Sequence, residues 1–150
     1  MDTDKTISTL NGLIETCKDG EIGFKTAAEG LRDTTLKAKF VTYANQRAVF
    51  VRELQEEVRR LGGDPETSGS MSGSMHRGWI NIKSAVTGQD DHAIVAEAER
   101  GEDVAKAAYD DALKEALAPS ARAIVQQQAT QVRQVHDAVR DARDRQTVAR

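Results

Sequence analysis

The feature that most constrains the fold is the spacing of apolar residues in two long stretches of the chain. From about residue 3 to 61, and again from about 90 to 145, apolar residues recur every three or four positions. This period of about 3.6 residues places them on one face of a helix and the charged residues on the other. A single apolar stripe must be covered, so the helices are expected to pack against one another.

Each stretch breaks once, so the pattern predicts four helices. The first stretch breaks between Gly30 and Asp33, where a glycine can end one helix and an aspartate can cap the next. The second breaks at Pro119 and Ser120, which are residue types that open helices. The predicted helices span about 3–30, 33–61, 90–117 and 120–145.

The segment 62–89 separates the two helix pairs and is rich in Gly and Ser in its first half. It is too long and polar for a hairpin loop, which predicts a crossover carrying a short helix at about 75–85. We therefore expect an all-α four-helix bundle, in which two antiparallel helix hairpins form a single domain over residues 1–150.

Composition excludes several classes of protein. No run of about 18 apolar residues exists to span a membrane, and no apolar signal segment follows Met1. The net charge of −3 gives no case for nucleic-acid binding. A single cysteine, Cys17, cannot form an internal disulfide, which fits a reducing compartment. We expect a cytoplasmic protein without nucleic-acid or membrane partners.

Five polar residues fall on or beside the predicted apolar faces: Glu21, Arg47, Glu102, Gln128 and His136. If the crossover makes the second and third helices parallel, Glu21, Glu102 and His136 reach nearly the same height, at about 1.5 Å of rise per residue. Arg47 lies within reach of that layer. Because a buried charge is costly unless it is paired, we expect a buried Glu21–Arg47–Glu102 network, completed by Gln128 and His136.

The alternative interpretation of the same layer is a metal site. Glu21, Glu102 and His136 on facing helices can hold iron, manganese or zinc. A di-metal bundle site needs a Glu-x-x-His motif on each of two helices, and this sequence has none. Arg47 also places a fixed cation where it repels a metal ion. We therefore expect no cofactor, with a degenerate metal site at these three residues as the alternative.

A second conspicuous group is His76, Arg77 and Trp79. A histidine and an arginine beside a tryptophan can form an anion or partner site. In the other interpretation, Trp79 and Ile82 dock the short helix on the bundle and Arg77 stays in solvent.

Several segments together resemble a known family. They are residues 10–24 (LNGLIETCKDGEIGF), 46–48 (QRA), 61–63 (LGG), 76–79 (HRGW) and 99–103 (ERGED). The combination is similar to bacterial ferritin-like four-helix-bundle proteins known as a domain of unknown function, over about residues 6–144. The resemblance implies the ferritin-like crossover topology and a cytoplasmic, stress-associated protein. It implies no reaction, and the missing Glu-x-x-His motifs separate this chain from iron-storing relatives.

No phosphate-binding loop, nucleophile elbow or Cys-x-x-Cys motif occurs in the sequence. The expected function is therefore that of a non-enzymatic bundle, which acts through homo-oligomerisation or a protein partner.

Overall fold

The computed structural model describes residues 2–69 and 78–149, and their side chains as far as residue 145. Throughout these residues the regular structure is helical, which confirms the expected all-α class. The helices are α1 (Thr3–Gly30), α2 (Thr34–Arg60), α3 (Ile82–Thr87), α4 (Asp91–Ala112) and α5 (Pro119–Ala149).

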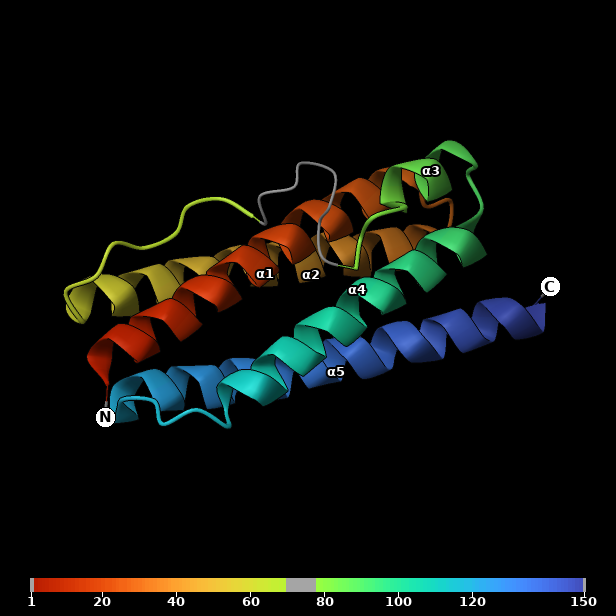
Figure 1. Ribbon diagram of the computed structural model, residues 1–150. Helices are drawn as coiled ribbons and strands as arrows, with labels where there is room; N and C mark the ends of the chain where they lie inside the picture. Colours follow the sequence, from red (N-terminus) through yellow and green to blue (C-terminus); the bar gives the residue numbers. More distant parts are fainter. Residues whose placement is uncertain (1, 70–77, 150) are drawn as a thin grey trace.

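The four long helices form two antiparallel hairpins, α1–α2 and α4–α5 (Figure 1). The connection between them returns the chain to the end where α2 began, so that α2 and α4 run in the same direction (Figure 1). Helix α1 packs on α2 and α4, and α5 packs on α4 and α2. Helices α2 and α4 are therefore diagonal to each other, with the core between them.

Aspartates begin three of the long helices. The side chains of Asp2, Asp33 and Asp90 each accept a hydrogen bond from a backbone N–H in the first turn of α1, α2 and α4. Such caps satisfy N–H groups that have no partner within the helix. Asp91 in turn accepts the backbone N–H groups of Arg32 and Asp33, at 2.9 and 3.0 Å. The turn between α1 and α2 is thereby tied to the start of α4.

Two predicted boundaries need correction. Helix α4 ends at Ala112 rather than near residue 117, and residues 113–118 form a turn that still buries Leu117. The hydroxyl of Thr6 accepts the backbone N–H of Ala118 there, at 3.3 Å. Helix α3 begins only at Ile82, whereas the short helix was expected from about residue 75, which lies outside the described residues.

The hydrophobic core consists of two clusters, one toward each end of the bundle. One contains Leu10 of α1 and Leu54 of α2, and the other contains Phe24 of α1 and Ile94 of α4. Along each of the four long helices, the residues of the first cluster and those of the second occupy separate stretches. The middle of the bundle, where these stretches meet, is where the buried charges lie.

Trp79 holds the connection onto the bundle. Its indole ring is buried in a slot between α1 and α4. The slot exists because Gly23 and Gly101 lack side chains: a Cβ at either glycine would lie 2.2 Å from a ring atom. Trp79 also meets the ring of Phe24 edge-on, with centroids 4.9 Å apart. Ile82 is buried beside it, so these two residues dock α3, as one interpretation of the sequence expected.

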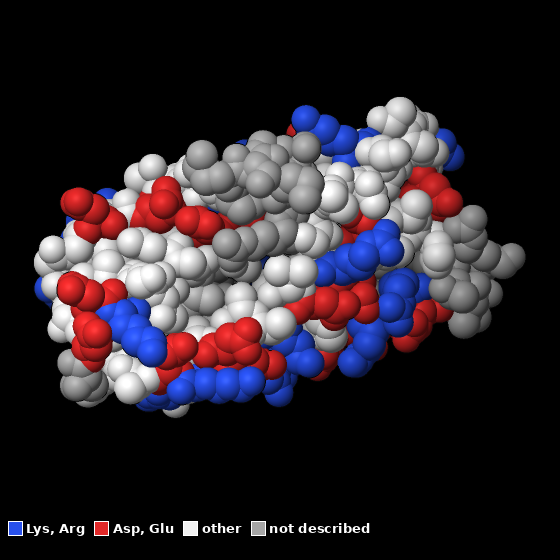
Figure 2. Space-filling model, viewed as in Figure 1, with Lys and Arg blue, Asp and Glu red and all other residues white. Residues whose placement is uncertain are grey.

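The face of the molecule drawn in Figure 2 carries interleaved charges of both signs. Figure 2 shows blue and red side chains mixed over the visible face, without a large field of one sign. Within the described chain, no helix is long and apolar enough to cross a membrane.

Candidate functional site

The centre of the bundle holds a buried ion pair between Arg47 of α2 and Glu102 of α4. Nη1 and Nη2 of Arg47 donate to the two carboxylate oxygens of Glu102, each at 2.7 Å. Both side chains are fully buried. Paired, parallel hydrogen bonds of this kind are among the strongest that side chains make.

The neighbouring residues are suited to this pair. A Cβ at Gly20 of α1 would lie 3.1 Å from Nη1, so the glycine leaves room for the guanidinium. The ring of Phe24 lies below it, with its centroid 5.5 Å from Cζ of Arg47. Burial lowers the pKa of Arg47, but the facing Glu102 outweighs burial and the pKa is raised. Arg47 is therefore a fixed cation.

Glu21, expected in the same network, lies apart from it. Its side chain is 25% exposed, and one carboxylate oxygen forms an ion pair with Nζ of Lys18, 3.5 Å away on the same helix. Glu21 is on the flank of the apolar stripe of α1 rather than in its centre.

A second buried polar group leads from Cys17 to the surface. The hydroxyl of Tyr109 donates to Oε1 of Gln128 at 2.6 Å, and Nε2 of Gln128 donates to the carboxylate of Glu53 at 2.9 Å. The sulfur of Cys17 lies 3.1 Å from the same hydroxyl. Because that hydroxyl donates its only proton to Gln128, it can only accept from Cys17, and the thiol is therefore the donor. Gln128, expected beside Arg47, belongs to this chain of hydrogen bonds instead.

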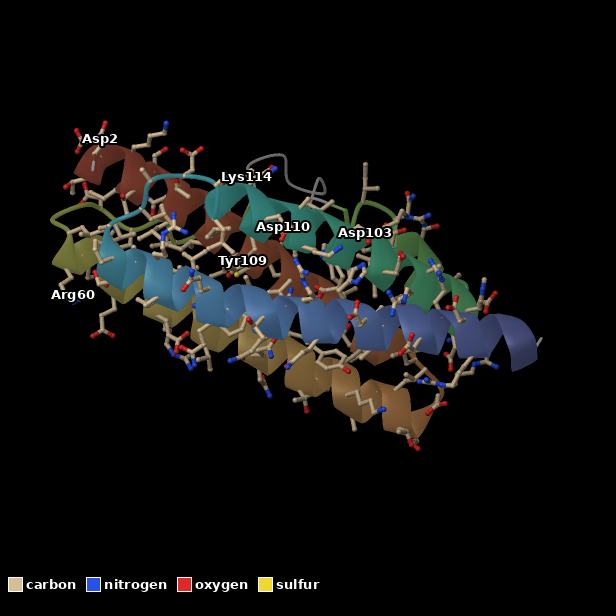
Figure 3. All side chains as sticks on the ribbon, turned by 90° about the horizontal axis from the view of Figure 1, so that it is seen from below. Asp2, Arg60, Asp103, Tyr109, Asp110 and Lys114 are labelled. Carbon is tan, nitrogen blue, oxygen red and sulfur yellow. The ribbon has the colours of Figure 1, made fainter. Side chains whose placement is uncertain are left out.

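The Cys17 thiol is held in its neutral form. Burial raises its pKa to about 11, against a smaller opposite effect of Arg47. Figure 3 marks Tyr109 on α4, together with Asp103 further along the same helix. Tyr109 is buried and Asp103 is exposed, so α4 contributes polar side chains both to the core and to the outer surface.

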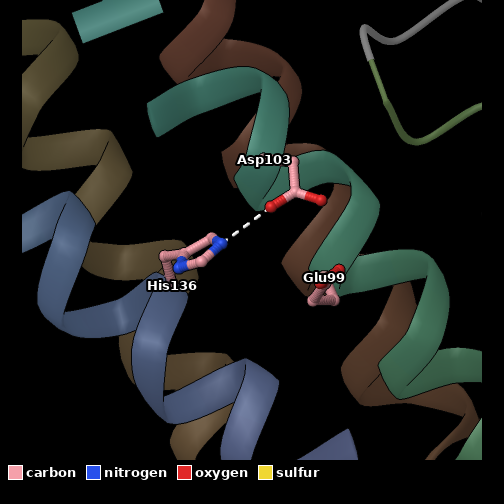
Figure 4. A group of neighbouring side chains, drawn as sticks. All are labelled: Glu99, Asp103 and His136. Carbon is pink, nitrogen blue, oxygen red and sulfur yellow. Dashed lines mark hydrogen bonds and ion pairs between the residues drawn. The ribbon is translucent and has the colours of Figure 1, made fainter. Parts of the chain in front are cut away.

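On that outer face, Glu99 and Asp103 of α4 meet His136 of α5 (Figure 4). One ligand atom from each lies within 4.8 Å of the others. Nε2 of His136 is 2.7 Å from a carboxylate oxygen of Asp103, and Nδ1 is 3.0 Å from one of Asp137. Among the described residues, this is the group whose side chains could share a metal ion.

The charges around His136 favour a cation at the imidazole. Burial lowers the pKa of His136, but the hydrogen bonds to Asp137 and Asp103 outweigh it and the pKa is raised. The neighbouring Glu99 carboxylate is held by Nη1 of Arg143, at 2.9 Å. The group is thus a small network of ion pairs and hydrogen bonds across the seam between α4 and α5.

The structure does not bring the three expected metal ligands together. Glu102 is bound to Arg47 in the core, His136 faces Asp103 at the surface, and Glu21 pairs on its own helix. Of the other expected site, Trp79 is a buried docking residue, while His76 and Arg77 lie outside the described residues.

Sequence reasoning missed Glu99 and Asp103 as partners of His136. Asp103 follows Glu102 directly, and one residue turns a helix by about 100°, which moves the side chain from the core to the face beside α5. The available signal was the spacing of Glu99 and Asp103, four residues apart and therefore on one side of α4.

Comparison with known proteins gives a family but no assigned activity. The family described as Domain of unknown function (DUF2383) matches residues 5–115, which begin in the first turn of α1, include α2 to α4 and end before α5. A search of curated proteins found no match.

Proposed function

The chain belongs to the family DUF2383, a domain of unknown function, and from that premise we propose that it is a non-enzymatic, ferritin-like helical bundle acting by self-association. A different protein chain as the partner is the alternative. The proposal places the protein in the cytoplasm, in a stress-associated role, as its resemblance to ferritin-like bundles implies.

The observation that carries the proposal is the ion pair of Arg47 and Glu102. Metal-binding helix bundles fill the middle of the core with carboxylates and imidazoles from facing helices. Here a guanidinium occupies that position and takes both oxygens of Glu102. These residues do not fit a di-metal centre, because Arg47 repels a metal cation and already binds both oxygens of Glu102.

Exposed apolar side chains on α2 support association. Val41 and Val49 are 47% and 40% exposed and lie about two turns apart on the outward side of the helix. Burying such side chains against another chain gains about 25 cal/mol for each Å² removed from water.

Sedimentation velocity over a range of protein concentrations tests the proposal. We expect a dimer or larger species for the wild type, and a shift toward monomer when Val41→Lys and Val49→Lys are combined. The matched control is Gln126→Lys together with Gln127→Lys, which adds the same charge at exposed positions of α5 and should leave the mass unchanged.

Two results would contradict the proposal. A wild type that stays monomeric at every concentration would exclude self-association and turn the search to a different partner. Oxidation of Fe²⁺ in air that is faster with the protein than in buffer alone would contradict the non-enzymatic assignment.

A further inference from the structure

We propose that Glu99, Asp103 and His136 form a surface site for a divalent metal ion of the zinc type, across the seam of α4 and α5. The site lies outside the core layer and goes beyond the proposed association. Its ligands are one imidazole nitrogen and two carboxylate oxygens.

The geometry needs only small side-chain adjustments: Nε2 of His136 and the Asp103 oxygen, 2.7 Å apart, must separate to admit an ion, and the more distant ligand atoms must approach. The three ligand atoms lie within 4.8 Å of one another, whereas atoms bound to one tetrahedral zinc ion are about 3.3 Å apart. Asp103 can supply the movement, because its side chain is 55% exposed. Glu99 and His136 are more deeply placed, with side chains 13% and 9% exposed. Glu99 belongs to α4 and His136 to α5, and long helices position ligands more precisely than loops do.

The hydrogen-bond partners of His136 also support a metal site. Both of its ring nitrogens face carboxylate oxygens, of Asp103 and of Asp137. A neutral imidazole has only one N–H, so the second nitrogen can face a carboxylate favourably only when it binds a proton or a metal ion. A metal ion at Nε2 meets this need, while Nδ1–H continues to donate to Asp137. A carboxylate on the far nitrogen is the usual support of a metal-bound histidine.

The donor set indicates the class of metal. Imidazole together with carboxylates suits zinc and similar first-row metals, whereas calcium and magnesium prefer oxygen ligands alone. Three protein ligands leave the fourth position of a tetrahedral ion to water.

Arg143 distinguishes this site from a simple ion network. Nη1 of Arg143 holds a Glu99 oxygen at 2.9 Å, so it competes with a metal ion for that ligand. Neutralising Arg143 removes the competitor and lowers the positive potential at the site. A metal site therefore gains affinity from Arg143→Gln, whereas a structural network would only lose an ion pair.

The test uses the full chain, stripped with chelator, with Zn²⁺ in calorimetry and Co²⁺ in visible absorption as probes. We expect one ion per chain and Co²⁺ bands typical of a four-coordinate site. His136→Gln and Asp103→Asn should each weaken binding at least about tenfold. Arg143→Gln should strengthen it several-fold. His92→Gln, which removes a histidine elsewhere, is the matched control and should change nothing.

Two outcomes would overturn the site: a wild type that binds Zn²⁺ no more tightly than His136→Gln, or an Arg143→Gln variant that binds more weakly. The helical circular dichroism of each variant shows whether it is folded. Unfolding would weaken Zn²⁺ binding, so it cannot produce the higher affinity expected for Arg143→Gln. Sedimentation velocity of the same variants measures their oligomeric state, so loss of Zn²⁺ binding can be distinguished from loss of the proposed association.

Discussion

Arg47 and Glu102 meet in the centre of the bundle from helices that are not neighbours. Helices α2 and α4 are diagonal, yet the two side chains span the core and form two hydrogen bonds of 2.7 Å. Each hairpin contributes one of the two charges. Neither half of the molecule can satisfy its own charge, so the halves depend on each other.

Breaking this pair should be costly. Arg47→Met leaves the Glu102 carboxylate buried without its partner, and such losses reduce the free energy of unfolding by about 3–5 kcal/mol. Urea denaturation followed by circular dichroism at neutral pH measures the change.

The control is the double variant Arg47→Met with Glu102→Leu, which removes both charges. We expect it to recover most of the lost stability, because apolar replacements of buried ion pairs are often neutral or stabilising. A double variant as unstable as the single one would mean that the pair matters for packing rather than for charge.

The slot around Trp79 predicts opposite effects for two glycine substitutions in α1. Gly23→Ala drives a Cβ into the indole ring and should cost about 1–3 kcal/mol of unfolding free energy. Trp79 is the only tryptophan, so its emission should move to longer wavelength. Gly12→Ala meets nothing within 4 Å and should stabilise by up to about 1 kcal/mol. Similar effects at both positions would argue against the slot.

The thiol of Cys17 should be inert in the folded protein. Its pKa is raised to about 11 by burial, so little thiolate exists at pH 8, and the sulfur is also inaccessible. We expect iodoacetamide to label native protein at least about 100-fold more slowly than urea-unfolded protein, in which the thiol pKa returns to about 8.5. Equal rates in the two states would place Cys17 at the surface.

The raised pKa of His136 predicts a pH dependence of stability in metal-free protein. Its cation is stabilised by Asp103 and Asp137 and opposed by Lys106. The contribution is therefore fully present below the ordinary histidine pKa of about 6.5 and is lost as the pH rises through the higher folded value. The stability difference between wild type and His136→Gln should be larger at pH 5.5 than at pH 9. Urea titrations in the presence of a chelator measure it, and a difference independent of pH would contradict the pairing.

The helices could be predicted because their signals are local and redundant. The stripe that includes Leu10 and Phe24 repeats over about six turns of 3.6 residues. Asp33 is a residue type that caps helices, which its own sequence shows. The early end of α4 could not be predicted, because no glycine or proline lies between Ala112 and Ala118. There the hydroxyl of Thr6, more than 100 residues away, receives the N–H of the turn.

The candidate site was predicted less well, because side-chain partners depend on small rotations. The heights of Glu102 and His136 along the bundle are similar, yet they face different ways and find different partners. Glu21 lies on the flank of the α1 stripe and forms its ion pair with Lys18 of the same helix. Spacing along a helix places a residue in height, whereas its partner depends on how the helices pack.

The ion pair also favours one alignment of the two hairpins along the bundle axis. Stripes of alanine, valine and leucine can slide past each other by one turn, about 5.4 Å, and still find apolar neighbours. The same slip would pull Arg47 away from Glu102 and leave two isolated charges in a dry interior. This one pair of residues thus makes the shifted arrangements of the helices unfavourable, although the apolar stripes alone would allow them.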